Sequence, residues 1–521
     1  MFITEGGFSY PPQIECRGLK NPRSVEEEIH RDYYEMISKI IYEYLNYFFV
    51  FCGNKKEFDM INVKMKISPE LDPGFIPAIL WNSEYSKLVE KSGKCVKIAI
   101  CLKRTNGSTS VLKTSILPDE PANFALNLKY VERLVKYLLW MKGGWKITIA
   151  GSPKLAEELR RIYSSSGTRK FDHEIMGEKI YGNEMTVESC ELRNAPKEKE
   201  TAVKLGGNLD GCRIGFDLGG SDRKCAAVID GNVVFTEEIP WDPYFQKDPS
   251  WHKAGINDTL KKAATHLPRI DAIGGSSAGV YVDNQVRVAS LFRGVPKDDF
   301  KNHVVNMFID LQKEWKVPFV VVNDGEVTAL AGAMSLNDNS VLGISMGTSM
   351  AAGYVTPAGT ITDWLNELAF APIDYREDAP LDEWSGDRGC GVQYFSQQGV
   401  ARLATLAGIE FKKEMPLAER LIGVQDLMKK GDDRARKIYS TIGTCFGYAV
   451  AQYSQFYELK NLLFLGRVSS GTGGEIIISK AQEVLKNEFP SLADKINFRT
   501  PDEKMKRHGQ AVAAASLPKS K

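Results

Sequence analysis

Apolar residues recur at helical spacing in the first long segment of the chain, residues 24–52. They recur singly or as adjacent pairs every three or four positions, at Ile29, Tyr33, Met36, Ile37, Ile40, Ile41, Tyr44, Leu45 and Phe48. Ser24 followed by Glu27 resembles a capping box, in which two side chains satisfy free amides at a helix N-terminus. Charged residues interrupt the run, whereas a membrane span needs ~20 nearly uncharged residues. We therefore expect a long, buried amphipathic helix here.

Short apolar runs and helical stretches alternate after this segment. The pattern predicts strands over residues 61–67, 96–102 and 145–150 and helices over 126–141 and 152–163. Such a mixture is typical of an α/β domain. The polar stretch 193–200 predicts a linker, so we expect a domain boundary near residue 200. No motif in residues 1–200 indicates what this part does.

Strands and glycine-rich turns dominate the chain from Arg213 onwards. The pattern predicts strands over residues 213–218, 224–229, 319–322 and 341–345. The first two flank the turn 219–223, Asp230-Gly231 predicts a hairpin turn, and Gly347-Thr348-Ser349 follows the last strand. Two strand pairs with glycine turns, one in each half, predict two related lobes that face a cleft.

Composition and charge narrow the class of protein. A length of 521 residues suggests about three domains, and 43% hydrophobic with 26% charged residues is typical of a globular chain. Lys and Arg number 67 against 66 acidic residues, so no net charge would attract nucleic acid. The N-terminus has no basic segment leading into an apolar run, so we expect no secretory signal and a cytoplasmic protein.

The metal-binding residue types are sparse. The nine cysteines include no Cys-x-x-Cys pair, and the six histidines are scattered. We expect reduced thiols and no structural zinc.

The first stretch that carries chemistry runs from Ile214 to Ser221. Gly219 and Gly220 would let backbone amides approach a phosphate closely, and Asp217 would hold a magnesium ion directly or through water. A common tight hairpin explains the same stretch equally well.

The second stretch, residues 320–326, is an apolar strand that ends in Asn323-Asp324. A carboxylate at the end of a strand reaches the cleft, where it would accept a hydroxyl proton as that oxygen attacks a γ-phosphorus. The alternative is that the pair only caps the following helix.

Two further glycine turns complete the set. Gly347 and Thr348 would hold the other side of a triphosphate, and the stretch 462–474 would offer a flat surface to an adenine ring. Plain hairpin and strand-to-helix connections are the alternatives.

The order of these motifs resembles the ROK family (repressor, open reading frame, kinase) over about residues 213–517. The family's order is also followed by the glycine-rich stretch 274–279, by Asn366-Glu367-Leu368 and by the closing stretch 508–514. The resemblance implies a fold in the α/β class, two-lobed and actin-like (ribonuclease H-like). We expect an additional α/β domain over residues 1–200, a first lobe over 206–335 and a second over 336–521.

The resemblance also implies an activity, which is ATP-dependent phosphorylation of a sugar hydroxyl. Asp324 would be the catalytic base, Asn323, Glu367 and Gly279 would bind the sugar, and Asp217 would lie near the magnesium ion. The phosphates would be held by Gly219, Gly220, Ser221, Gly347 and Thr348, and the adenosine would be flanked by Gly466 and Gly473.

Several positions depart from the family pattern. Phe370 stands where members usually carry a His, and only Cys390 remains of a cysteine-rich zinc cluster. Ser290 replaces a common Asn, and Asp222 stands where a Lys often follows the first turn. The departures indicate a substrate other than ordinary glucose, or low activity.

Two other functions compete with the kinase. One is a catalytically weak protein that only senses sugar, and the other is a ROK-type transcriptional regulator. Residues 1–200 argue against the regulator, because they are longer than a helix-turn-helix module and lack a basic recognition helix. The expected partners are a small sugar and a nucleotide, with no nucleic acid and no membrane, and a homo-oligomer is possible.

Overall fold

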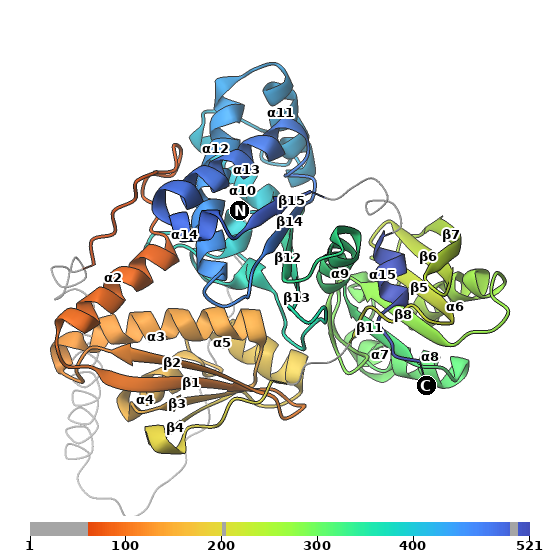
Figure 1. Ribbon diagram of the computed structural model, residues 1–521, viewed down its shortest axis with the longest axis horizontal. Helices are drawn as coiled ribbons and strands as arrows, with labels where there is room; N and C mark the ends of the chain where they lie inside the picture. Colours follow the sequence, from red (N-terminus) through yellow and green to blue (C-terminus); the bar gives the residue numbers. More distant parts are fainter. Residues whose placement is uncertain (1–60, 201–204, 501–508, 521) are drawn as a thin grey trace, which may run out of the picture. The chain divides into compact units, whose positions relative to one another are not determined.

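The computed structural model describes residues 61–200, 205–500 and 509–520 (Figure 1). The elements below belong to one compact unit, Val63–Lys521. The helix predicted over residues 24–52 and the His508 end of the closing motif lie outside the described residues. None of the helices in the described ranges is long and apolar enough to cross a membrane.

The first sheet, called here the N-terminal sheet, has the strand order β2-β1-β3-β4. Its strands are β1 (Val96–Lys103), β2 (Thr109–Ile116), β3 (Lys146–Ala150) and β4 (Thr186–Cys190). The helices α2 (Ala78–Lys91), α3 (Pro121–Lys142) and α4 (Pro153–Ile162) accompany it. β1 pairs antiparallel with β2 and β3, while β3 and β4 are parallel. The sequence pattern predicted an α/β domain here, with strands and helices that correspond to β1, β3, α3 and α4. It did not predict β2, β4 or α2.

The strand predicted over residues 61–67 is wrong. Among the described residues they pair with no strand, and they contact helices near the C-terminus instead. The backbone N–H of Lys66 donates to Glu488, and the Tyr448 hydroxyl donates to the Ile67 carbonyl at 2.9 Å. Side-chain bonds therefore replace a sheet ladder.

The predicted linker is attached to the N-terminal sheet. The backbone groups of Lys199 pair with those of Thr109 at 2.8 and 2.9 Å, and the Glu200 carboxylate forms ion pairs with Arg104 and Lys142. The chain is thus held in place up to residue 200. The boundary near residue 200 stays a prediction.

The next two sheets share the order of four strands, and the first of them has a fifth strand at its edge. The β5 sheet has the order β11-β8-β5-β6-β7, and the β12 sheet has the order β13-β12-β14-β15. In each, a hairpin (β5 and β6, or β12 and β13) is followed by two strands parallel to its first strand. The strands are β5 (Cys212–Leu218), β6 (Asp222–Ile229), β7 (Asn232–Pro240), β8 (Ala272–Ser277), β11 (Phe319–Asn323), β12 (Val341–Met346), β13 (Met350–Val355), β14 (Asn461–Leu465) and β15 (Asn497–Arg499).

Helices cover these sheets and connect them. They are α6 (Pro249–Ala264), α8 (Met307–Trp315), α9 (Asp324–Leu336), α10 (Gln397–Leu406), α11 (Leu417–Lys429), α12 (Asp433–Tyr453), α13 (Gly471–Glu488) and α15 (Gln510–Ala515). α9 leaves β11 and packs against β12 and β13, so the start of α9 lies where the two sheets approach each other. Figure 1 shows α15 beside β5 and β6.

Glycines allow α15 to lie directly on the β5 sheet. A Cβ atom at Gly215 would lie 1.7 Å from the Ala511 carbonyl oxygen, and one at Gly274 would lie 1.7 Å from the Ala514 oxygen. Side chains at these positions would push the helix away. Part of the glycine-rich stretch 274–279 therefore serves helix packing.

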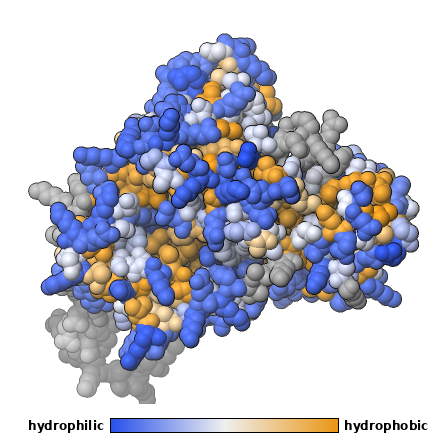
Figure 2. All heavy atoms as spheres, in the orientation of Figure 1, coloured by the Kyte–Doolittle hydropathy of each residue, from blue (hydrophilic) through white to orange (hydrophobic). Residues whose placement is uncertain are grey.

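The apolar core of the β5 sheet lies beneath α6 and α8, with Ile214, Phe216, Ile256, Leu260 and Phe308 fully buried. Figure 2 shows hydrophilic residues over much of the visible face, with hydrophobic residues gathered near β6 and β7, where Val233 and Val234 are exposed.

Candidate functional site

Polar side chains, two of them carboxylates, gather at the carboxyl ends of three parallel strands. β8 lies between β5 and β11, and the register places Asp217 beside Ser276, and Asn323 beside Ser277. The Ser276 hydroxyl donates to Asp217 Oδ1 at 2.6 Å. Asp324 follows Asn323 as the first residue of α9. Adjacent parallel strands thus bring residues about 100 positions apart in sequence to one edge of the sheet.

These carboxyls hold their protons more tightly than usual. Burial raises the pKa of Asp217 to about 6. The hydrogen bond from Ser276 lowers this pKa, and the nearby Asp324 charge raises it. Burial and the same charge raise the pKa of Glu367 to about 7. Burial also raises the pKa of Asp324, which the Gly325 amide partly offsets. The Asp324 charge therefore repels the charged forms of both Asp217 and Glu367. A bound cation, or hydroxyl groups that donate to these carboxylates, would reduce this repulsion.

Asn323 performs the capping role considered above. Its Oδ1 accepts from the Gly325 N–H at 2.7 Å, and Asp324 Oδ1 accepts from the same amide at 3.0 Å. The Asn323 Nδ2 donates to the Gly279 carbonyl at 2.7 Å. The cap fixes the start of α9 and ties it to the loop after β8.

The backbone of Glu367 is held by α3. The Glu367 N–H donates to the Trp140 carbonyl at 2.9 Å, and the Asn366 N–H donates to the Met141 carbonyl at 2.8 Å. Carbonyls in the last turn of a helix have no partner inside the helix, so they are available for such bonds. The N-terminal part of the chain thus positions a predicted sugar-binding residue.

Asn366 is fixed from the other side as well. Its backbone has a φ of 50°, a left-handed torsion that Asn tolerates better than most residues. Its Oδ1 accepts from the Tyr457 hydroxyl at 2.7 Å, and its Nδ2 donates to Glu326. The orientation of Asn366-Glu367 is therefore set by three elements.

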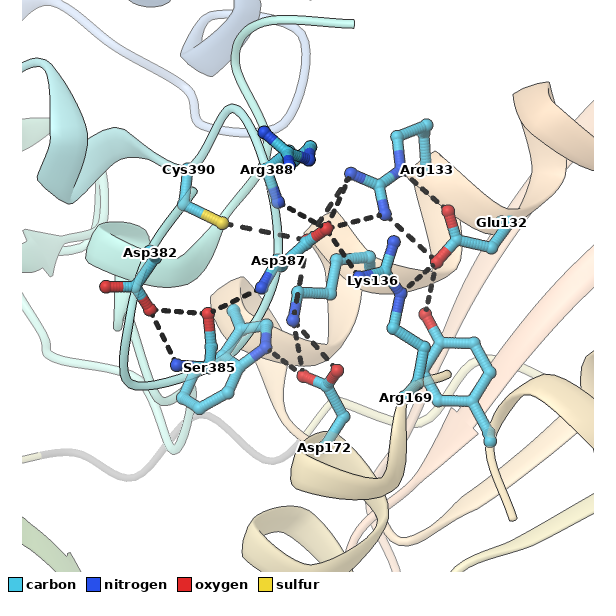
Figure 3. A network of polar contacts seen from close by, with 12 residues as sticks. Glu132, Arg133, Lys136, Arg169, Asp172, Asp382, Ser385, Asp387, Arg388 and Cys390 are labelled. Carbon is cyan, nitrogen blue, oxygen red and sulfur yellow. Dashed lines mark hydrogen bonds and ion pairs between the residues drawn. The ribbon is translucent and has the colours of Figure 1, made fainter. Parts of the chain in front are cut away.

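A buried ion network joins α3 to the loop before Cys390 (Figure 3). Lys136 Nζ lies 2.7 Å from Asp172 Oδ1 and 3.6 Å from Asp387 Oδ2, and Arg133 lies 3.3 Å from Asp387. Burial alone would lower the pKa of Lys136, but the two carboxylates outweigh it and hold that pKa above its usual value. The network fixes α3 against the segment that follows Glu367.

Two of the positions that depart from the family pattern, Phe370 and Cys390, lie at this junction. The Cys390 Sγ is buried 3.6 Å from Asp387 Oδ2, and burial raises the pKa of its thiol. Phe370 packs on Trp140 with ring centroids 4.4 Å apart. In the described ranges, no three His, Cys, Asp or Glu side chains form a group that could hold a metal ion. The expected absence of zinc stays a prediction.

A cavity of about 280 Å³ lies beside these groups. Gly279, Asn323 and Glu367, the three residues predicted to bind sugar, all line it. Sequence reasoning missed much of the rest of its polar lining, which includes Arg104, Thr105, Asn106, Tyr181 and Asp363.

The first glycine turn lies beside the carboxylates. The Gly219 N–H donates to the Asp222 carbonyl at 2.9 Å, and the Ser221 hydroxyl donates to the Asp222 side chain at 2.8 Å. Lys224 stands directly opposite Asp217 in the β5–β6 register, with its Nζ 3.1 Å from Asp222. Sequence reasoning missed Lys224 as a half-buried cation of the site, although its position directly after the turn 219–223 is visible in the sequence.

Space around Gly220 is limited, because a Cβ there would lie 2.0 Å from the Tyr244 hydroxyl. The second turn is more open. The Gly347 N–H donates to the Ser349 carbonyl at 2.9 Å, and Thr348 is exposed. A Cβ at Gly347 would meet only the Ser349 oxygen at 3.7 Å.

The two glycines predicted near the adenosine differ in their surroundings. Gly466 has a φ of 109° and lies against Met346, the residue before the second turn. Gly473 is buried against the ring of Tyr439, where a Cβ would lie 2.5 Å from a ring carbon. Gly466 is thus next to the second turn, whereas Gly473 serves the packing of α13.

No family model and no curated protein matches the chain. Among solved structures, the chain is similar to the ROK hexokinase from Thermus thermophilus, at 16% identity and a TM-score of 0.48, covering 59% of this chain and 97% of that one. A ROK family glucokinase from Streptomyces griseus, in complex with glucose and AMPPNP, has 19% identity and a TM-score of 0.43, covering 59% and 99%.

A third similar structure is a ROK family transcriptional regulator, a homologue of the E. coli MLC protein. It has 17% identity and a TM-score of 0.46, and the match covers 60% of this chain and 78% of that one. The three structures carry the name of the family that the order of sequence motifs resembles.

Proposed function

We propose that the chain is an ATP-dependent kinase that transfers the γ-phosphoryl group to a hydroxyl of a hexose or hexose derivative. The observation that carries the proposal is a group of three buried carboxyls, in which the Asp324 charge acts on Asp217 and on Glu367, beside a cavity that Glu367 lines. Buried acidic groups with raised pKa values are typical of sites that move protons or bind charged ligands.

The fold we infer is two-lobed and actin-like, over residues 206–335 and 336–521, preceded by an N-terminal domain over residues 1–200. Support comes from the strand order shared by the β5 and β12 sheets. Each sheet begins with a hairpin whose turn contains glycine, which matches two phosphate-holding turns on opposite sides of one nucleotide.

In the proposed reaction, Asp324 accepts the proton of the attacking hydroxyl. Its raised pKa makes it a stronger base than an exposed Asp once it is ionised. Asn323, Glu367 and Gly279 bind the sugar from the walls of the cavity. Because Asn323 already caps α9, its remaining amide hydrogen is the group left to reach a sugar oxygen.

Nucleotide binding is assigned to the glycine turns. The Gly219 and Gly347 amides close their own turns, so the phosphates are held by the amides of Gly220, Ser221 and Thr348. Lys224 is nearby, and Gly466 and Gly473 flank the adenosine. Asp217 would hold the magnesium ion that accompanies ATP, and this ion supplies charge neutralisation for the transferred group. A single carboxylate suits magnesium, which keeps most of its other positions for phosphates and water.

A protein that only senses sugar is the second candidate. It is favoured by Phe370, which packs on Trp140 and leaves no polar group where the family carries a His. A transcriptional regulator has no such support, since residues 63–200 form a sheet with helices. The cytoplasmic location and a homo-oligomer stay predictions.

The test is phosphoryl transfer by the purified full chain. ATP and magnesium are incubated with a panel of hexoses, amino sugars and acylated amino sugars, and sugar phosphates are measured by mass spectrometry. We expect stoichiometric sugar phosphate and ADP with at least one sugar. Sugar binding without any transfer would favour the sensor, and neither binding nor transfer would contradict both candidates.

A further inference from the structure

A second pocket lies on the N-terminal sheet, between strands β1 to β4 and the segment 194–199 that follows them. Its volume is about 500 Å³. The described residues that line it are all different from those that line the cavity beside the carboxyls. They include four lysines and one carboxylate, whereas the whole chain carries a formal net charge of only +1. Positive charge is therefore concentrated in this pocket.

The strand register places three of these lysines in one row across the sheet. Lys103 on β1 stands directly opposite Lys146 on β3 and, on its other side, opposite Thr109 on β2. The backbone of Thr109 pairs in turn with that of Lys199. Directly opposite residues of a ladder project from the same face, so these four side chains share one face of the sheet. All four line the pocket.

The lysines of the pocket have too few counter-charges. Lys146 pairs with Glu188, with 2.6 Å between Nζ and Oε1. Lys103, Lys197 and Lys199 form no ion pair with any residue in the described ranges. Like charges that stand directly opposite each other in a sheet are destabilising. An anion bound among these lysines would remove the repulsion.

Two buried hydroxyls in the lining also lack a partner. Thr148 is 7% exposed and Thr109 is 9% exposed, and neither hydroxyl bonds to a described residue. Unlike the Tyr181 hydroxyl, neither is closed off from solvent. Thr148 stands opposite Cys101, two residues before Lys103, so it shares the face of the lysines. Because buried polar groups nearly always have a partner, these hydroxyls indicate a ligand with oxygens that accept hydrogen bonds.

A phosphate group fits these donors better than a carboxylate. It carries about two negative charges and its oxygens point in several directions, so ammonium groups from β1, β3 and the 194–199 segment can reach it together with both hydroxyls. A carboxylate offers one charge and two oxygens in a plane. The pocket also exceeds the ~300 Å³ at which pockets for small organic ligands begin, so an esterified phosphate has room for its organic part.

We propose that the N-terminal sheet carries a binding site for the phosphate group of a small molecule, formed by Lys103, Lys146, Lys199, Thr109 and Thr148. The lysines are gathered in one hollow around two buried hydroxyls, whereas a nucleic acid strand is bound along an extended basic groove with aromatic side chains. The site gives a role to the part of the chain before residue 200. It does not depend on the proposed function.

Calorimetry on the full chain tests the site. Inorganic phosphate, glycerol 3-phosphate and acetate are titrated at equal ionic strength, and the first two decide whether the phosphate is free or esterified. We expect at least one of the two phosphates to bind, and acetate to bind at least about tenfold more weakly. Equal binding of acetate, or no binding of either phosphate, would overturn the inference. So would a short single-stranded oligonucleotide that binds when neither small phosphate does.

Lys103→Gln should weaken phosphate binding about tenfold, the loss expected for one charge-assisted hydrogen bond. Lys97→Gln is the matched control, because Lys97 is an exposed lysine on the same face of β1, ~20 Å along the strand, and does not line the pocket. It should bind phosphate as the wild type does. An equal loss in both variants would mean that only the overall charge matters, which would overturn the inference.

Thr148→Val removes the hydroxyl and keeps the shape of the side chain. Because this hydroxyl has no partner among the described residues, the variant should be at least as stable in urea as the wild type. It should bind phosphate about fivefold more weakly. Phosphate affinity that stays unchanged in Thr148→Val, or in Lys103→Gln, would place the bound phosphate elsewhere in the chain and overturn the assignment of this site.

Discussion

Ionisation of Glu367 is the residue property that most directly governs sugar binding in this account. Its pKa is raised to about 7, so the carboxylate form that accepts sugar hydroxyls is the minor form at pH 6. Sugar affinity should therefore rise about tenfold between pH 6 and pH 8 and then level off. Binding at pH 6.5 should release protons, measurable by calorimetry in buffers of different ionisation enthalpy.

Glu367→Gln should abolish this pH dependence. Glu383→Gln, at an exposed position, is the control and should retain it. The same shift affects stability. The pKa of Glu367 is about 7 in the folded state and 4.5 for an ordinary Glu, so folding favours the protonated form. The stability that this preference contributes is present below about pH 4.5 and is lost as the pH rises through about 7. Glu367→Gln should thus gain stability relative to wild type at pH 8. A sugar affinity that stays constant with pH would contradict the assignment.

Residues at the ends of apolar strands were predictable, because a strand pattern fixes where the chain reaches the sheet edge. Asp217, Asn323 and Asp324 were found in this way, and the structure brings the first two to one edge. Tyr181 and Arg104 carry no such pattern. Their place in the cavity depends on contacts between distant segments, which one sequence does not encode locally.

Among the elements, α3 connects the N-terminal sheet to the site, because its last turn accepts from the Glu367 and Asn366 amides. Lys136→Met leaves Asp172 and Asp387 without their shared cation, and breaking a buried pair costs about 3–5 kcal/mol. We expect a lower free energy of unfolding in urea and weaker sugar binding, because the last turn of α3 holds the Glu367 backbone.

Lys87→Met is the control for this change. Lys87 pairs with Glu84 on α2, and its side chain is 65% exposed, so its loss should cost less than about 1 kcal/mol. If the two variants were equally stable, the buried network would have no special role in holding α3.

The second glycine turn offers a clean test of nucleotide binding. Gly347→Ala meets nothing closer than 3.7 Å in the protein, so the fold should be kept while the added methyl group blocks close approach of a phosphate. We expect nucleotide affinity to fall about tenfold, with sugar affinity unchanged. Gly255→Ala on α6, where the nearest atom is 3.6 Å away, is the control. Unchanged nucleotide affinity would make the turn an ordinary hairpin.

Elements with strong periodicity were predicted well, and the others were missed. The predicted helix over residues 126–141 corresponds to α3, and the strand over 96–102 corresponds to β1. β2 was missed because its residues are mostly polar or half-buried, without clear alternation. Residues 61–67 have the pattern of a strand, but no strand in the part of the chain that the structure describes pairs with them.

At the scale of the whole molecule, the sequence predicted two related lobes but not the strand order that the two sheets repeat. Two glycine turns suggested two related lobes, and the β5 and β12 sheets share their order without visible sequence repetition. Topology is determined by long-range pairing, so it survives where residue identities have diverged.

Two turns that grip one triphosphate imply coupling between the ligands. Sugar and nucleotide should each increase the affinity for the other by the same factor, about 5–150-fold, because coupling free energies are reciprocal. Calorimetric titrations of each ligand in the absence and presence of the other measure this factor, with a non-hydrolysable nucleotide. Independent binding of the two ligands would contradict closure of the site around both.

The most direct test of the central claim is phosphoryl transfer by Asp324→Asn. Asn retains the oxygen that caps α9, so the fold and both ligand affinities should be kept, while turnover falls by about 10²–10⁴. Asp494→Asn, at an exposed position, is the control and should turn over like the wild type. Sugar phosphate formed at the wild-type rate by Asp324→Asn would contradict its role as the catalytic base.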